Sequence, residues 1–282
     1  MSADNRSVRD ALYETPGPKA RRRVRAATVL SLAAIAFLIW KCIRLFAENG
    51  QLDTRYWSFF TKITTWRFLG SGLLGTLAVA AASGALAFGL GLLFMLGRIS
   101  RSGWLRAVSA ALIEFTRGVP TLLFIYFFFL AAPQIGITLP SFWKIALPVA
   151  ISASGVVAEV LRSGVNAVPK GQREAALSLG MQESHAFFRI ILPQAMRYIV
   201  PSLISELVIV VKDTTFAYVV NFPDLMQNAK VLISNYDALL SVYLVVALIY
   251  ILINYLLNRV SDFAARHRNS SMIAPQQKQE VL

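Results

Sequence analysis

The stretch Glu174-Ala175-Ala176-Leu177-Ser178-Leu179-Gly180, followed after nine residues by Ile190-Ile191-Leu192-Pro193, is the most informative part of this chain. It lies in a polar, basic segment between two apolar segments. The two alanines keep one side of a short helix thin, Gly180 predicts the C-terminal end of that helix, and Pro193 limits the helix that follows. A thin, capped helix can lodge in a groove on another protein, so we expect a docking element here and not a plain connector.

The composition around this stretch is that of a membrane protein. The chain has 282 residues, of which 56% are hydrophobic and only 15% charged, with a mean hydropathy of +0.57. A soluble domain has about a quarter of its residues charged. Apolar windows of about 20 residues, the length that crosses a bilayer core as a helix, recur along the chain. We therefore predict an all-α polytopic membrane protein with six spans, at about 27–46, 72–97, 108–132, 143–164, 198–220 and 238–258.

The net charge of +13 is distributed unevenly between the two sides of these spans. With the N-terminus inside, the inner segments hold eighteen Lys and Arg residues and the outer segments four, namely Arg55, Lys62, Arg67 and Lys230. The positive-inside rule then predicts that both termini and the loop at 165–197 are cytoplasmic. Anionic lipid headgroups account for the remaining basic charge, so we expect no role in nucleic-acid binding.

The spans divide the chain into five regions. The first span is long and no small-residue cleavage site follows it, so it is not a signal peptide. Cys42 is the single cysteine, which excludes an intrachain disulfide, and no Cys/His cluster has the spacing of metal ligands. The expected regions are a basic, disordered arm at 1–26, a membrane helix at 27–46, an outer segment at 47–71 that forms either an interfacial helix or a linker, a transmembrane domain at 72–260, and a tail at 261–282.

Ionisable residues inside the predicted spans fall into three sets. Each costs on the order of 2.5–3.5 kcal/mol near the bilayer centre, so such residues usually mark a pathway or pair with one another. Glu114 and Arg117 stand three residues apart, as do Glu159 and Arg162, so each couple is either an intrahelical ion pair or part of a pathway. For Arg162, snorkelling to the cytoplasmic surface is the simpler interpretation. The third set lies deeper and predicts a polar cavity: Glu206, Lys212 and Asp213.

The third predicted span also contains a break. In Gly118-Val119-Pro120, the proline has no N–H to donate and opens the hydrogen-bond ladder of the helix. Broken backbone at membrane depth is tolerated mainly where it lines protein or a water-filled cavity.

Taken together, these motifs resemble the bacterial ABC importer permeases. The Glu-Ala-Ala, Gly and Ile-x-Leu-Pro spacing is similar to their EAA loop, which docks the membrane subunit onto its ATPase. Four further motifs resemble the polar amino acid permeases of that superfamily: Arg117-Gly118-x-Pro120, Ala158-Glu159-x-x-Arg162, Pro169-Lys170-Gly171-Gln172 and Lys212-Asp213-Thr214-Thr215. The resemblance covers roughly residues 70–260. It implies a five-helix type I importer core with a coupling-helix loop, to which the span at 27–46 is an N-terminal addition.

The resemblance also implies site residues and partners. The ATPase-coupling residues would be Glu174, Ala175, Ala176, Gly180, Ile190, Leu192 and Pro193, and the substrate-pathway residues Glu114, Arg117, Glu159, Lys212 and Asp213. The expected partners are an ABC ATP-binding subunit, a second permease subunit that is a copy or a paralogue, and an extracytoplasmic solute-binding protein. ATP and Mg would be bound by the ATPase, because this chain has no Gly-x-x-x-x-Gly-Lys-Ser/Thr sequence. The chain is then not itself an enzyme, and it resides in a bacterial cytoplasmic membrane.

The overall pattern resembles glutamate importer permeases more than histidine or arginine ones, so glutamate is the favoured substrate. Arg117 or Lys212 would hold the α-carboxylate, and Glu114, Glu159 or Asp213 the ammonium group. Two other classes were weighed. An ion-coupled secondary transporter or channel would use the intramembrane acids but leave the Ala-rich loop without a purpose. An intramembrane enzyme would need paired aspartates or a nucleophile set, which the sequence lacks.

Overall fold

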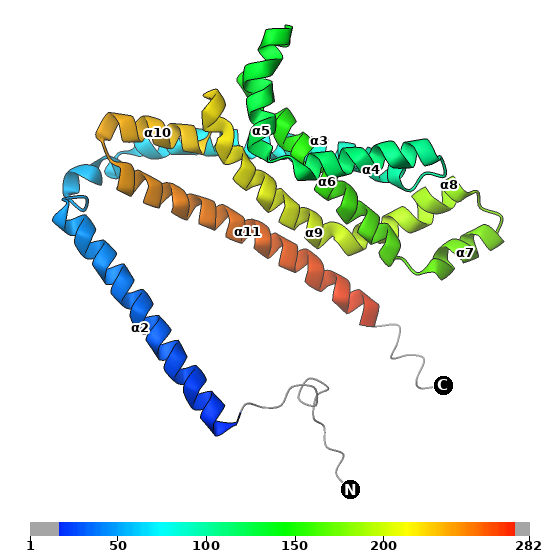
Figure 1. Cartoon of the computed structure of the whole chain (residues 1–282), viewed down its shortest axis with the longest axis horizontal. Coiled ribbons are helices and arrows are strands. Elements are labelled where there is room, and N and C mark those ends of the chain that lie inside the picture. The colour runs from blue at the N-terminus through cyan, green and yellow to red at the C-terminus, as the bar shows by residue number, and fades with distance from the viewer. Residues whose placement is uncertain (1–16, 274–282) are drawn as a thin grey trace. The chain divides into compact units, whose positions relative to one another are not determined.

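The computed structural model describes residues 17–273, and side chains as far as residue 263; this part of the chain contains helices and no strands (Figure 1). The chain divides into two compact units, Met1–Ser58 and Phe59–Leu282. Each is described by itself below.

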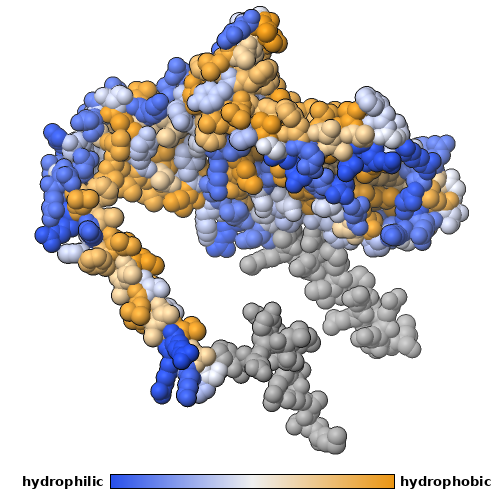
Figure 2. All heavy atoms as spheres, in the orientation of Figure 1, coloured by the Kyte–Doolittle hydropathy of each residue, from blue (hydrophilic) through white to orange (hydrophobic). Residues whose placement is uncertain are grey.

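The first unit contains one long helix, α2 (Pro18–Glu48), followed by a short 3₁₀ turn, Thr54–Tyr56. Helix α2 is long and apolar enough to cross a membrane, in agreement with the predicted span at 27–46. It begins with basic residues and is apolar along most of its length (Figure 2). The predicted disordered arm is wrong for residues 18–26, which are helical because Pro18 suits the first turn of a helix and good helix formers follow it. Residues 1–16 lie outside the described part.

The second unit is a bundle of helices that differ widely in length. Its α-helices are α3 (Ile63–Arg98), α4 (Gly103–Gly118), α5 (Thr121–Tyr126), α6 (Ser141–Ala167), α7 (Lys170–Ser178), α8 (Glu183–Ala186), α9 (Leu192–Asp213), α10 (Leu225–Tyr236) and α11 (Leu239–Ile273). Short 3₁₀ or π segments complete it: Ser58–Thr61, Phe127–Ala131, Ala132–Ile135, Phe187–Ile191 and Thr214–Val220.

Four of the six predicted spans correspond to single long apolar helices, namely α2, α3, α6 and α11. The span predicted at 108–132 is broken where the sequence predicted, because α4 and the segment from Thr121 to Ile135 meet at an angle of 96°. The bend falls at Val119 and Pro120, where Val119 is extended, as residues before proline tend to be. The fifth predicted span, 198–220, corresponds to α9 and the 3₁₀ segment after it, which are less apolar because they carry Glu206, Lys212 and Asp213.

The core of the second unit lies between α3, α6 and α9. Val79 and Met95 of α3 and Val149 and Leu161 of α6 are fully buried in it. The small residues of α3 allow this close packing, since a Cβ at Gly91 would stand 2.7 Å from the Val157 side chain. This face of α3 is therefore buried against other helices.

Several helix boundaries differ from the predicted ones. Helix α3 begins at Ile63, inside the segment predicted as an outer interfacial region at 47–71. Helix α11 continues to Ile273, well into the predicted tail at 261–282. Helix α10 was not predicted, because it is short and mixes polar with apolar residues. Its N-terminus is capped by the Asp224 carboxylate, which accepts a hydrogen bond from the Gln227 N–H at 2.7 Å.

Helix α10 is fastened to the first third of α3. The Leu225 N–H donates to the Thr76 hydroxyl at 3.1 Å, and the Asn228 amide donates to the Phe68 carbonyl at 2.7 Å. Gly75 leaves room for this contact, since a Cβ there would stand 2.6 Å from the Pro223 carbonyl oxygen. Helices α7 and α8 lie at the opposite end of the second unit from α10 (Figure 1).

Candidate functional site

The loop between α6 and α9 is ordered as a helix, a turn and a second helical segment. Helix α7 ends in a Schellman motif: the Gly180 N–H donates to the Leu177 carbonyl at 2.9 Å, and the Met181 N–H donates to the Ala176 carbonyl at 3.1 Å. Gly180 has a φ of +79°, a left-handed conformation that favours glycine. The helix and its glycine stop are therefore as the sequence predicted.

Helix α7 has one face turned inward and one face free. Ala176 is only 2% exposed and is the buried residue of α7. Glu174, Ala175 and Gly180 are exposed. Leu179 was not singled out from the sequence, yet its side chain is 84% exposed at the end of the helix. The second unit is largely hydrophilic at the end that carries α7 and α8 (Figure 2).

The remaining predicted coupling residues hold the loop in place. The Ile190 carbonyl accepts a hydrogen bond from the Gln194 amide at 3.0 Å, and the same amide donates to the Gln172 side chain at 3.2 Å. Leu192 packs against the core, and Pro193 occupies the first turn of α9. Ile190 and Leu192 are partly buried, whereas Pro193 is exposed.

An ion-pair cluster, which sequence reasoning missed, joins this loop to the one between α3 and α4. Both oxygens of the Glu183 carboxylate accept hydrogen bonds from the Arg173 guanidinium, and one of them also accepts from Arg101 at 2.9 Å. Arg101 is 82 positions from Glu183 in the sequence. No local pattern could have shown that these residues meet.

Of the predicted pathway residues, Glu114, Arg117 and Glu159 form ion pairs within their own helices. Glu114 and Arg117 lie 3.5 Å apart, and Glu159 and Arg162 lie 2.6 Å apart. The Glu114 side chain is 75% exposed. Each couple thus forms an ion pair within its helix, and the sequence spacing of three residues was enough to find these pairs.

Asp213 lies where α5, α6 and α9 meet. Its carboxylate accepts a hydrogen bond from the Thr121 hydroxyl at 2.9 Å, and this hydroxyl lies 2.8 Å from that of Ser152. Lys212 is exposed and makes no ion pair within residues 17–263. Thr121 and Ser152 were not predicted from the sequence, although Thr121 directly follows the interruption of the helix at Pro120.

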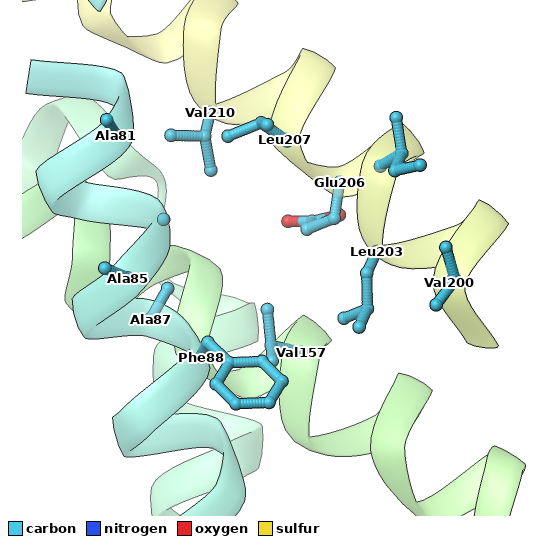
Figure 3. Close-up of a pocket in the computed structure, with 12 residues that line it drawn as sticks. Ala81, Ala85, Ala87, Phe88, Val157, Val200, Leu203, Glu206, Leu207 and Val210 are labelled. Atoms are coloured by element: carbon cyan, nitrogen blue, oxygen red, sulfur yellow. The ribbon is translucent and has the colours of Figure 1, made fainter. Parts of the chain in front are cut away.

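A cavity of about 370 Å³ lies between α3, α6 and α9, and Glu206 points into it (Figure 3). Glu206 is 7% exposed and makes no hydrogen bond to any residue that the structure describes. The expectation of a polar cavity shared by Glu206 and Asp213 is wrong in two respects, because Asp213 is not in the lining and the other lining side chains are apolar. The facing residues of α3 are alanine, glycine and phenylalanine, which pack closely but offer no polar atoms.

The second unit is thus a helical bundle with one bent span and an ordered loop at one end. The family described as "Binding-protein-dependent transport system inner membrane component" matches residues 87–269. The chain belongs to this family and is a polar amino acid ABC permease component. In this family the permease is a non-enzymatic integral subunit of the inner membrane, and ATP is hydrolysed by a separate subunit.

Relatives with assigned names share about a third of their residues with this chain. The glutamate transport system permease protein GluD of Corynebacterium glutamicum is 35% identical over 77% of this chain and 81% of its own length. The probable glutamine ABC transporter permease protein GlnP of Bacillus subtilis is 36% identical over 68% of this chain and 89% of its own. The L-cystine transport system permease protein TcyB of Bacillus subtilis is 30% identical over 71% of this chain and 86% of its own.

Solved structures share the fold. A crystal structure of an amino acid ABC transporter with histidines matches 74% of this chain and 98% of its own, with a TM-score of 0.69 and 29% identity. The inward-facing MetNI methionine ABC transporter matches 73% of this chain with a TM-score of 0.63 and 19% identity, which shows the likeness of the fold alone.

Proposed function

We propose that this permease carries glutamate into the cell, driven by ATP hydrolysis in a partner subunit. The observation that favours glutamate is the 35% identity with GluD over 77% of the chain. Glutamine and cystine permeases among the relatives are the competing assignments within the same transport class. An ion-coupled secondary transporter is disfavoured, because it would leave the exposed face of α7 without a role.

The face of α7 formed by Glu174, Ala175, Leu179 and Gly180 is the proposed contact with the ATPase. These residues are exposed together at the end of the unit where the loop lies. Ala176, Ile190, Leu192 and Pro193 seat the same loop on α9, so displacement of α7 is passed to α9 through the Gln172–Gln194 hydrogen bond and the buried Ala176. In this arrangement ATP-driven closure of two ATPase subunits moves α9 and opens the permease to alternate sides of the membrane.

The pathway itself would lie along α5, α6 and α9. Arg117 is paired with Glu114, and Glu159 with Arg162, so two groups retain unneutralised charge: Lys212 and Asp213. Lys212 suits an α-carboxylate, and Asp213, whose hydrogen-bond donor is a neutral hydroxyl, suits the ammonium group. A second permease subunit would complete the pathway, and an extracytoplasmic binding protein would deliver the solute.

The proposed orientation places both termini and α7 in the cytoplasm. Arg98, Arg101, Arg106, Lys170 and Arg173 belong to the two loops that would then face inward, as the positive-inside rule requires.

The test is to purify the chain from its native membrane in mild detergent, identify what accompanies it, and reconstitute the assembly in liposomes with its binding protein. Recovery of an ABC ATPase and a second permease, with ATP-driven uptake of glutamate in preference to glutamine, cystine and arginine, is the expected result. Preferred uptake of another amino acid would overturn glutamate alone. Recovery of no ATPase, together with uptake that needs no ATP, would overturn the coupling proposal.

A further inference from the structure

We propose that Glu183 is a positioning residue that couples the docking helix α7 to the α3–α4 loop through Arg173 and Arg101, so that movement of the loop reaches α4 as well as α9. The inference rests on the proposed function, in which α7 is moved by an ATPase.

Arg101, Arg173 and Glu183 form an ion-pair cluster, which we call the clamp. The Arg173 guanidinium donates to both oxygens of Glu183, one of them at 3.2 Å, in the bidentate arrangement that fixes orientation as well as distance. Arg101 donates to one of the same oxygens at 2.9 Å. One carboxylate thus holds two cations that come from two different loops.

Without the clamp, α7 has few attachments to the rest of the bundle. It is a helix of 9 residues, and only Ala176 in it is buried. Its side-chain link to α9 is the 3.2 Å contact between Gln172 and Gln194. A displacement of α7 would therefore reach α9 but would have no polar route to the α3–α4 side of the bundle in the part of the chain that the structure describes.

The clamp supplies that route. Arg101 lies two residues before α4, a rigid helix of 16 residues that ends at Gly118. The bend of 96° follows at once, and Thr121, the first residue beyond it, is hydrogen-bonded to Asp213. A displacement of Arg101 is transmitted along α4 to the bend and from there to the residues around Asp213. The displacement of α7 moves α9 at the same time.

The cluster is largely solvent-exposed, with the Arg101 side chain 85% exposed. Each exposed ion pair is worth little on its own, so the clamp orients the two loops and is not needed for folding. Its loss is expected to change the efficiency of coupling by about two- to fivefold and to leave assembly intact.

The experiment uses the complete importer, purified with its ATPase and second permease and reconstituted with the binding protein, and measures solute imported per ATP hydrolysed. In Glu183→Gln and in Arg101→Gln, this ratio should fall about two- to fivefold while the ATPase is recovered in full. Arg101→Lys, which keeps the charge, should retain most of the ratio. The double variant Glu183→Gln/Arg101→Gln should be no worse than Glu183→Gln alone, because Glu183→Gln already breaks the contact with Arg101.

Arg106→Gln is the matched control. It removes the same charge from the start of α4 but breaks no ion pair among the described residues, so its ratio should equal that of the wild type. An unchanged ratio in Glu183→Gln, or effects of Glu183→Gln and Arg101→Gln that simply add, would overturn the clamp alone. Loss of the ATPase from Glu183→Gln would also overturn it, by making Glu183 a docking contact. A wild-type chain that recovers no ATPase would overturn the proposed function itself.

Discussion

Gly180 is the residue whose backbone conformation the docking loop depends on most directly. Its φ of +79° costs an L residue with a side chain about 1–2 kcal/mol, and a β-branched side chain fits it least well. In Gly180→Val, the end of α7 should therefore shift, and ATPase recovery should fall about 5- to 30-fold while membrane insertion is unchanged.

Gly171 offers a matched control for this substitution, since it lies in the same helix with no positive φ and open space around its Cα. Gly171→Ala should recover the ATPase as the wild type does. Full recovery of the ATPase by Gly180→Val would contradict the assignment of this turn to docking. The measurement is quantitative mass spectrometry of the purified assemblies.

Glu183 titrates below the pH range in which the importer works. Hydrogen bonding from Arg173 lowers the pKa of the Glu183 carboxyl from its usual 4.5. The clamp's contribution is therefore complete above pH 4.5 and is lost only as the pH falls through the lowered pKa. Between about pH 5.5 and 8 on the cytoplasmic side, the wild type and Glu183→Gln should keep a constant ratio of coupling efficiencies. A ratio that changes with a midpoint near neutrality would show that another group controls the contact.

At the scale of whole elements, the junction of α5, α6 and α9 depends on one hydroxyl. Thr121→Val keeps the shape of the side chain but removes the donor to Asp213, which leaves a half-buried carboxylate without that partner, at a cost of about 1–3 kcal/mol. Uptake should fall while the ATPase stays bound. Thr121→Ser keeps the hydroxyl and should transport nearly as the wild type. Equal uptake in the two variants would show that the hydrogen bond plays no part in the pathway.

The seat of α10 on α3 is a second contact between elements. In Gly75→Leu, the new Cβ would lie only 2.6 Å from the Pro223 carbonyl oxygen. Overpacking of this kind costs about 1–3 kcal/mol. The apparent melting temperature in detergent should fall by about 2–4 °C for each kcal/mol lost. Gly89→Leu, in the same helix but with nothing within 4 Å of its Cβ position, is the control and should melt as the wild type. Equal melting of both variants would mean that α10 is not held at this seat.

At the scale of the whole molecule, the energy source separates an ABC importer from an ion-coupled transporter. The intramembrane acids are paired with arginine, hydrogen-bonded to a hydroxyl, or set in an apolar cavity, and none forms a cluster that suits a cation within the described residues. Substitution of the phosphate-binding lysine in the partner ATPase should therefore abolish uptake, whereas a proton or sodium ionophore should leave it unchanged. Uptake that survives the ATPase substitution and stops with the ionophore would reverse this assignment.

The sequence by itself determined those features that depend on residues close together in the chain. The end of α7 at Gly180, the ion pairs Glu114–Arg117 and Glu159–Arg162, and the break at Pro120 each follow from spacings of a few residues, as do the apolar lengths of α2, α3, α6 and α11. Helix periodicity, capping and proline chemistry act locally, so they can be read from the sequence without a fold.

Only the tertiary structure decided what joins distant parts of the chain. The contacts of Thr121 with Asp213, Arg101 with Glu183, and Leu225 with Thr76 join residues that are 92, 82 and 149 positions apart. It also showed that Glu206 faces an apolar cavity and that α10 packs on α3. Such contacts arise from the way helices pack against one another, which the local periodicity of each helix does not specify. For that reason α7 and its glycine stop could be predicted, whereas the contact of Arg101 with Glu183 could not.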